Sequence, residues 1–204
     1  MATRKQTESR FESFMRGLSA AVQLSRRAVD NGSFIESVCL AASIIDAQLR
    51  MGLILNYQLQ TASSDLLDDL LHQPDKADIV TERSIYKRAL KENIISQETY
   101  DELNALYYKR NRVVHRYIIS DTTTEEVLRI AQRYSDMVHA VNESVRRLED
   151  EQLRRGVGMT IAGDKVPQSI RGKAKEMMEK EADEKHGNPN LARNLRASPE
   201  KGAS

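Results

Sequence analysis

One helical stripe of apolar side chains constrains the fold of this chain more than any other feature. The stripe covers residues 34–57, and its spacing predicts an α-helix that buries one broad face. Its members are Phe34, Ile35, Val38, Ala41, Ala42, Ile45, Leu49 and Leu53. Ser33 followed by Glu36 is the capping-box pattern of a helix start. We therefore predict that this helix begins after Ser33 and is the central element of the core.

Four further segments follow a helical period. They are residues 7–30, residues 81–92, a helix that starts after Ser96, and a helix that starts after Thr123 and runs to about residue 155. Four prolines, no tryptophan and 5% aromatic residues also favour helices over sheets. The sequence thus predicts an all-α fold, an up-down bundle of four to five helices.

The chain of 204 residues is long enough for one domain with a real core and an additional segment. We predict a helical domain over 1–155. Residues 156–204 contain no aromatic residue and are rich in Lys, Glu, Gly, Asn and Pro. Because such a composition buries too little apolar area to offset the ordering entropy, we predict a flexible, disordered C-terminal tail.

Several classes of protein are disfavoured by composition. Cys39 is the only cysteine, which excludes an intrachain disulfide and a Cys-rich zinc site. The sequence has no Gly-rich phosphate loop and no metal-binding spacing of His, Asp or Glu, so it predicts neither a metal site nor a cofactor. The first residues lack the apolar core of a signal peptide, and no apolar run approaches a membrane span. We therefore expect a cytoplasmic protein with no membrane partner.

Candidate functional residues gather in one stretch, 107–117. Four cations and three phenols surround His115 there, although the formal net charge of the whole chain is only +1. Any contact with nucleic acid must therefore come from a local patch. Lys109, Arg112 and Arg116 are the candidate phosphate-binding cations of this patch. The same residues can also be read as a solvated basic helix face with no chemistry.

Arg110 stands out within this stretch because it falls in an apolar row. The predicted row is Tyr100, Leu103, Leu106, Tyr107, Arg110, Val114 and Tyr117. A charge in a core-facing row is costly unless it meets a partner, a phosphate or an interface, which favours a functional Arg110. His115 supplies an imidazole, a group that can give or take a proton near neutral pH. It lies about 140° further round an ideal helix, so a shared cleft is permitted but not required.

The spacing Arg110-Asn111-x-x-x-His115-x-Tyr117 resembles the R-x4-H motif of the HEPN superfamily and the R-x4-H-x-Y form of the HepT toxins. The resemblance covers roughly residues 10–150 and implies an all-α bundle with metal-independent endoribonuclease activity. Arg110 would stabilise charge on the scissile phosphate, His115 would transfer protons, and Asn111 would bond phosphate or fix the histidine.

The resemblance also implies partners. The motif offers one histidine per chain, so a homodimer through the motif face is expected, with RNA as the substrate. A role as a toxin or a defence or stress-response component would bring an antitoxin, or a nucleotidyltransferase that modifies Tyr117. The long C-terminal tail, Arg112 and Arg116 depart from the HepT pattern.

Three alternatives stay open. Glu36 or Asp46 could orient the arginine or histidine of the motif, or Asp46 could simply pair with Arg50 across one helical turn. The motif could belong to a non-catalytic helical module that grips a nucleotide, an RNA or an acidic protein without cutting. A small helical regulator that assembles through its tail is a third reading.

Overall fold

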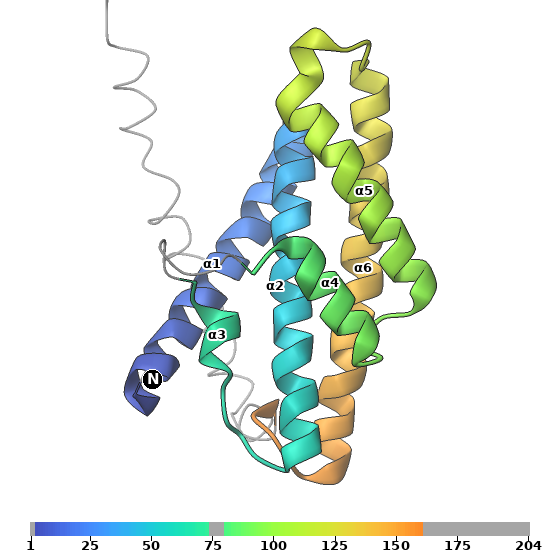
Figure 1. Cartoon of the computed structure of the whole chain (residues 1–204). Coiled ribbons are helices and arrows are strands. Elements are labelled where there is room, and N and C mark those ends of the chain that lie inside the picture. The colour runs from blue at the N-terminus through green and yellow to red at the C-terminus, as the bar shows by residue number, and fades with distance from the viewer. Residues whose placement is uncertain (1–2, 74–79, 161–204) are drawn as a thin grey trace, which may run out of the picture.

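The computed structural model describes residues 3–73 and 80–160, and every regular element in this part is helical (Figure 1). The elements are α1 (Arg4–Asp30), α2 (Phe34–Thr61), α3 (Asp68–Leu71), α4 (Glu82–Lys91), α5 (Gln97–Arg116), the 3-10 turn η1 (Tyr117–Ile119) and α6 (Thr124–Arg155). The predicted all-α bundle is confirmed. The one-turn α3 lies between α2 and α4 in the chain.

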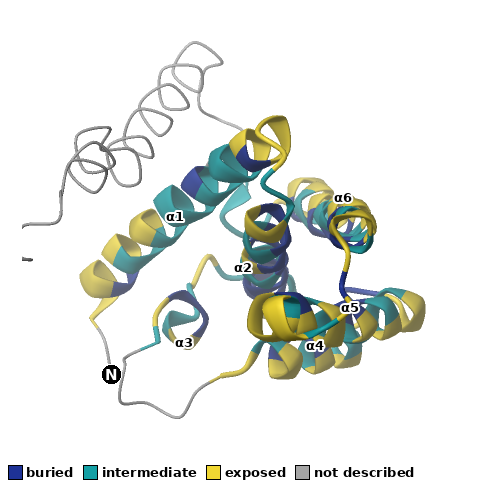
Figure 2. Ribbon diagram, turned by 90° about the horizontal axis from the view of Figure 1, so that it is seen from above, coloured by how far each residue is buried: buried dark blue, intermediate teal, exposed yellow. Residues whose placement is uncertain are grey.

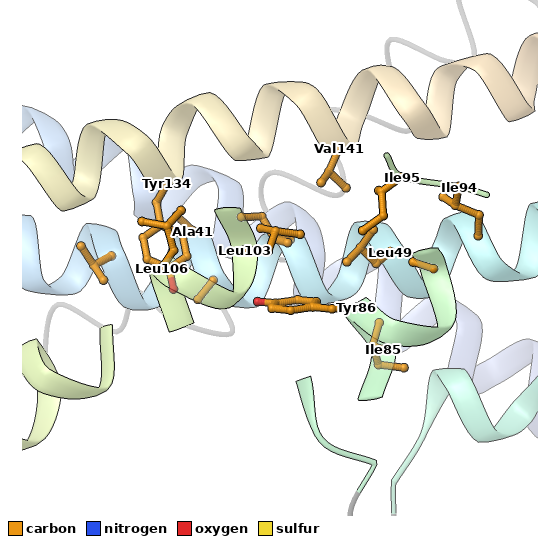
Figure 3. Packing of buried hydrophobic residues seen from close by; sticks show 14 of the residues in the cluster. Ala41, Leu49, Ile85, Tyr86, Ile94, Ile95, Leu103, Leu106, Tyr134 and Val141 are labelled. Atoms are coloured by element: carbon orange, nitrogen blue, oxygen red, sulfur yellow. The ribbon is translucent and has the colours of Figure 1, made fainter. Parts of the chain in front are cut away.

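Helix α2 is the centre of the bundle, as its apolar stripe predicts. Seen from above, α1 covers one side of α2, α6 the other, and α4 and α5 lie together near α6 (Figure 2). The most extensive contact in the fold joins α2 and α6. Val38, Ile45, Leu49 and Leu53 on α2 have no exposed surface, and side chains of α4, α5 and α6 close over this face (Figure 3). Burial of this face stabilises the bundle.

Helix α2 begins after Ser33 as predicted, but its cap and the start of α1 differ from the sequence-based prediction. The Ser33 side chain makes no capping bond, because its backbone at φ −82° and ψ 66° lies outside the extended conformation of a capping residue, so the predicted capping box with Glu36 is wrong. A capping box forms instead at Thr3 with Gln6. It satisfies the free amides of the first turn, and α1 therefore begins at Arg4 rather than near residue 7.

Helix α2 is also longer than predicted and ends at Thr61, where the next residue, Ala62, caps it in the left-handed conformation. By length and composition it could cross a membrane, although 61% of its most apolar stretch is buried inside the bundle. The expectation that no apolar run approaches a membrane span is therefore wrong. This extent of burial is what the central helix of a bundle requires.

A hydrogen-bonded cluster closes the base of the bundle, where α2 and α6 end. Gln58 and Gln152 are fully buried, and the Gln152 Nε2 donates to Gln58 Oε1 at 3.0 Å and to Leu55 O at 3.1 Å. Gln58 Oε1 also accepts from the Met159 amide at 3.1 Å, and Gln152 Oε1 accepts from the Thr160 amide at 3.1 Å. We call Gln58, Gln152, Met159 and Thr160 the glutamine cluster. It fixes the chain beyond the end of α6 onto the core.

The chain turns back from α6 through Gly156 and Gly158, both with positive φ. A Cβ at Gly158 would lie 2.3 Å from the amide carbon of Gln152, so this position needs glycine for space as well as for conformation. The packed part of the chain thus reaches Thr160, beyond the predicted boundary at residue 155. The predicted disordered tail otherwise falls on residues 161–204, which lie outside the described residues.

Candidate functional site

The motif lies at the other end of the bundle from the glutamine cluster, where α5 ends and α6 begins (Figure 1). The buried row of α5 contains Leu103, Leu106 and Val113, and Arg110 falls between them. Val114, which the sequence placed in this row, is 42% exposed, so the prediction is wrong by one residue there. The spacing of three and four residues from Leu106 through Arg110 leads to Val113, and Val114 then points outward.

Arg110 is held from the neighbouring helix by a carboxylate. Its Nη2 donates to Glu82 Oε2 of α4 at 2.6 Å, and the two side chains keep only 22% and 15% of their surface exposed. Its Nε is buried without a hydrogen-bond partner. Its Nη1 makes no hydrogen bond to any residue in 3–73 or 80–160, and it is not among the buried nitrogens. The core-facing charge therefore meets a protein partner, and one nitrogen remains free for a ligand.

Glu82 is fixed in turn by Tyr86, one turn later on α4. The Tyr86 hydroxyl donates to Glu82 Oε1, and the ring has no exposed surface. Burial raises the pKa of Tyr86 above that of an ordinary tyrosine, and the Glu82 charge raises it further, so the hydroxyl keeps its proton. Burial is the largest influence on the pKa of Arg110 and lowers it, but the Glu82 charge and hydrogen bond together with Tyr134 and Tyr86 outweigh burial, and the net shift is upward. Arg110 thus stays a cation.

An aromatic contact completes the surroundings of Arg110. Its guanidinium carbon lies 5.1 Å from the centre of the Tyr107 ring, and that of Arg83 lies 5.8 Å from the same centre. Cations placed over an aromatic ring are attracted by its quadrupole. Arg83 also donates through Nε to Asn104 Oδ1 at 3.3 Å, which ties the start of α4 to α5. Two helices therefore fix Arg110.

The other motif residues face outward. His115 and Arg116 in the last turn of α5, and Lys109 one turn earlier, are exposed, while Asn111 is half-buried. His115 has no hydrogen bond or ion pair to any described residue. Arg112 is about half exposed and contacts Glu126 of α6 at 3.5 Å. Within one copy, Arg110 points inward and His115 points into solvent.

The two carboxylates proposed from the sequence do not hold the motif. Asp46 Oδ2 accepts from Arg50 Nε at 2.7 Å, which is the helical pair that the spacing predicts. Neither Asp46 nor Glu36 has a bond to Arg110 or His115 among the described side chains. Glu36 instead lines a groove of about 520 Å³ at the motif end, together with Phe34, Tyr117 and Val127.

Apolar side chains stand exposed directly after the motif. Ile118 and Ile119 of η1 are 94% and 81% exposed. Large apolar residues exposed side by side in a tight turn contribute almost nothing to the stability of a single copy. They come three and four positions after His115 in the chain and directly follow Tyr117, which lines the groove.

Within the described ranges, no three His, Cys, Asp or Glu side chains come together as metal ligands. No protein-family model matches the chain, and no curated protein and no solved structure was found to be similar to it. The HEPN resemblance therefore depends on the motif residues and on the all-α fold.

Sequence reasoning missed Glu82 and Tyr86. Glu82 had only the signal of a favourable acid in a helix's first turn. Tyr86 lies in a buried row with Ile85 and Ala89, and a hydroxyl in such a row needs a partner. That partner is one turn back on the same helix, whereas the contact from Glu82 to Arg110 spans 28 positions and has no trace in helical periodicity.

Proposed function

We propose that this protein is a metal-independent endoribonuclease of the HEPN type that acts at the motif end of the bundle. One observation carries the proposal: Arg110 is fixed in a buried row with one nitrogen left for a ligand, and an unbonded histidine follows it on the same helix. A guanidinium suits a phosphate group, and an imidazole suits proton transfer near neutral pH.

The reaction would be a transesterification within the RNA. The ribose 2′-hydroxyl loses its proton, its oxygen bonds to phosphorus, and the bond from phosphorus to the 5′ oxygen breaks as that oxygen takes up a proton. The products are a 2′,3′-cyclic phosphate and a free 5′-hydroxyl. His115 would serve one proton transfer, Arg110 would offset the charge on the phosphate, and Asn111 would bond phosphate or the histidine. Lys109, Arg112 and Arg116 would bind neighbouring phosphates.

Two proton transfers and one histidine per chain favour a composite site made by two copies. The exposed Ile118 and Ile119 beside His115 offer an apolar contact for a two-fold homodimer at this end. Such a dimer would bring two histidines to one cleft. A toxin or defence role, with an antitoxin or a nucleotidyltransferase acting on Tyr117, belongs to the same proposal and depends on the same motif.

The test is cleavage of mixed RNA in the presence of a chelator by the wild type and by His115→Ala. We expect the wild type to cut and to leave 2′,3′-cyclic phosphate ends, and the variant to be inactive with its helical content unchanged. RNA blocked at the 2′ position should bind without being cut. Cutting by His115→Ala, or a strict need for magnesium, would reject the proposal.

A second candidate function is a helical module that binds RNA or a nucleotide without cutting. It is favoured by the placement of Arg110 and His115, which point inward and outward within one copy. The same assay separates the two functions. RNA that binds to the exposed cations but stays intact with the wild type would favour the binding module.

A further inference from the structure

Glu82 is a carboxylate that the motif does not contain, yet it makes the shortest contact of Arg110 with another helix. The pair joins α4 to α5 at the motif end. An inference about its role rests on the proposed function, because it concerns how Arg110 meets a phosphate.

A second interhelical ion pair shows how a contact that only links two helices is built. Glu102 of α5 and Arg133 of α6 also form an interhelical pair, with Nε at 2.7 Å from Oε1 and Nη2 at 2.6 Å from Oε2. Both carboxylate oxygens and both facing nitrogens are used, so this pair is closed on itself. It links two helices, and since Arg133 Nη1 also has no hydrogen bond within the described part of the chain, the two pairs differ in how the carboxylate is shared and not in a free nitrogen.

The contact of Glu82 with Arg110 is built differently. Glu82 gives only Oε2 to Arg110 and uses Oε1 to accept from Tyr86. Arg110 gives only Nη2 to Glu82 and leaves Nη1 unbonded within the described part of the chain. The Tyr107 ring restrains the guanidinium from another side. An anchored anion thus fixes the cation without consuming its outer nitrogen.

We propose that Glu82 is a positioning residue, which holds Arg110 so that its Nη1 meets an RNA phosphate in a preset orientation, and that Tyr86 fixes Glu82 for this purpose. Preset donors cost less reorganisation when the negative charge develops, so this contact acts mainly on the rate of the chemical step. A lysine at 110 could not serve Glu82 and a phosphate through two nitrogens at once.

The test compares Glu82→Ala, Glu82→Gln and Tyr86→Phe with the matched control Glu102→Gln, on full-length protein. Cleavage rates and the guanidinium NMR signals of Arg110, with and without a 2′-O-methyl RNA, are the two readouts. For Glu82→Ala we expect kcat to fall about tenfold or more with a much smaller change in KM. Glu82→Gln should restore part of the rate, since its amide oxygen still accepts from Nη2. Glu102→Gln should stay within about twofold of the wild type.

The NMR readout keeps this inference separate from the proposed function. If the wild type binds the RNA but cuts none, the ribonuclease proposal fails. The positioning role still stands in that case if the RNA shifts the Arg110 signal in the wild type and in Glu102→Gln but not in Glu82→Ala. Unchanged cutting and unchanged RNA response in folded Glu82→Ala would overturn the positioning role. So would tighter RNA binding by Glu82→Ala, because Glu82 would then be masking Arg110. An Arg110 NMR signal that does not change when RNA is added to the wild type would overturn the positioning role as well.

Discussion

The two ends of the bundle differ in whether their polar side chains have hydrogen-bond partners. At the base, the side-chain amides of Gln58 and Gln152 are fully buried, and each nitrogen and oxygen has a partner. At the motif end, His115 and two nitrogens of Arg110, Nε and Nη1, have no hydrogen-bond partner among the described residues, and two isoleucines are exposed to solvent. A network that is complete rigidifies the fold, whereas donors and apolar groups left over are what a ligand or a second copy can use.

The largest effect should come from the base. Gly158→Ala places a methyl group against the buried amide of Gln152 and strains a backbone with φ of +84°, so we expect a loss of about 3 kcal/mol. Gly156→Ala is the matched control, because its φ is +70° but no atom lies within 4 Å of the added carbon. Its cost should be about 1 kcal/mol. Denaturant unfolding of both variants measures the difference, and equal losses would show that the glutamine cluster does not restrain Gly158.

A middle-sized effect separates the two buried tyrosines of the core (Figure 3). The Tyr86 hydroxyl bonds Glu82, so Tyr86→Phe should lose about 1.5 kcal/mol. The Tyr134 hydroxyl has no partner among the described residues, so Tyr134→Phe should change the free energy of unfolding by less than about 0.5 kcal/mol. The same unfolding measurement tests this. A larger loss for Tyr134→Phe than for Tyr86→Phe would contradict the assigned bonding.

Alkaline pH should lower the free energy of unfolding through Tyr86 and Tyr134. Burial raises the pKa of Tyr86 and of Tyr134, so above a pH of about 10 the proton leaves the unfolded chain first. The stabilisation from the neutral rings is fully present below that pH and is lost as the pH rises toward the folded-state pKa values. Unfolding free energies between pH 9 and 11 should therefore fall less steeply for Tyr86→Phe than for the wild type. Equal slopes would show that the Tyr86 hydroxyl is not shielded.

The smallest effect on stability should come from Ile118→Ser. This side chain is 94% exposed, so we expect a change below about 0.5 kcal/mol in one copy. If the motif end forms a dimer, sedimentation at micromolar concentration should show dimers for the wild type and weaker association for Ile118→Ser. Leu153→Ser on α6, at the base end, is the control for an exposed apolar residue, and it should leave association unchanged. A monomeric wild type would remove the composite site.

Much of the fold could be predicted, because helix formation is local. The apolar rows of α2 and α6 and the cap at Thr123 fixed these helices to within a few residues. The position of Arg110 in a buried row was also visible in the spacing. The row of α5 was followed correctly to Arg110 and then missed Val113, because a four-residue step was expected where the buried face advances by three.

The contacts that set the character of each end could not be predicted. Glu82 meets Arg110 across 28 positions, and Gln152 meets Gln58 across 94. Gln58 lay just beyond the predicted end of its helix, where nothing in the sequence marks it as buried. Such pairs depend on how helices cross, which the hydrophobic period of a single helix does not encode. The exposure of Ile118 and Ile119 could not be predicted, because exposure is a property of the packed fold.

The most direct test of this account is hydrogen exchange on the full-length protein, with and without a 2′-O-methyl RNA that binds but cannot be cut. We expect the RNA to slow exchange at the end of α5 and in η1, around residues 107–119, and to leave the glutamine cluster at the base unchanged. Protection that appears at the base, or none at the motif end while the RNA is bound, would contradict the claim that the motif end is the functional one.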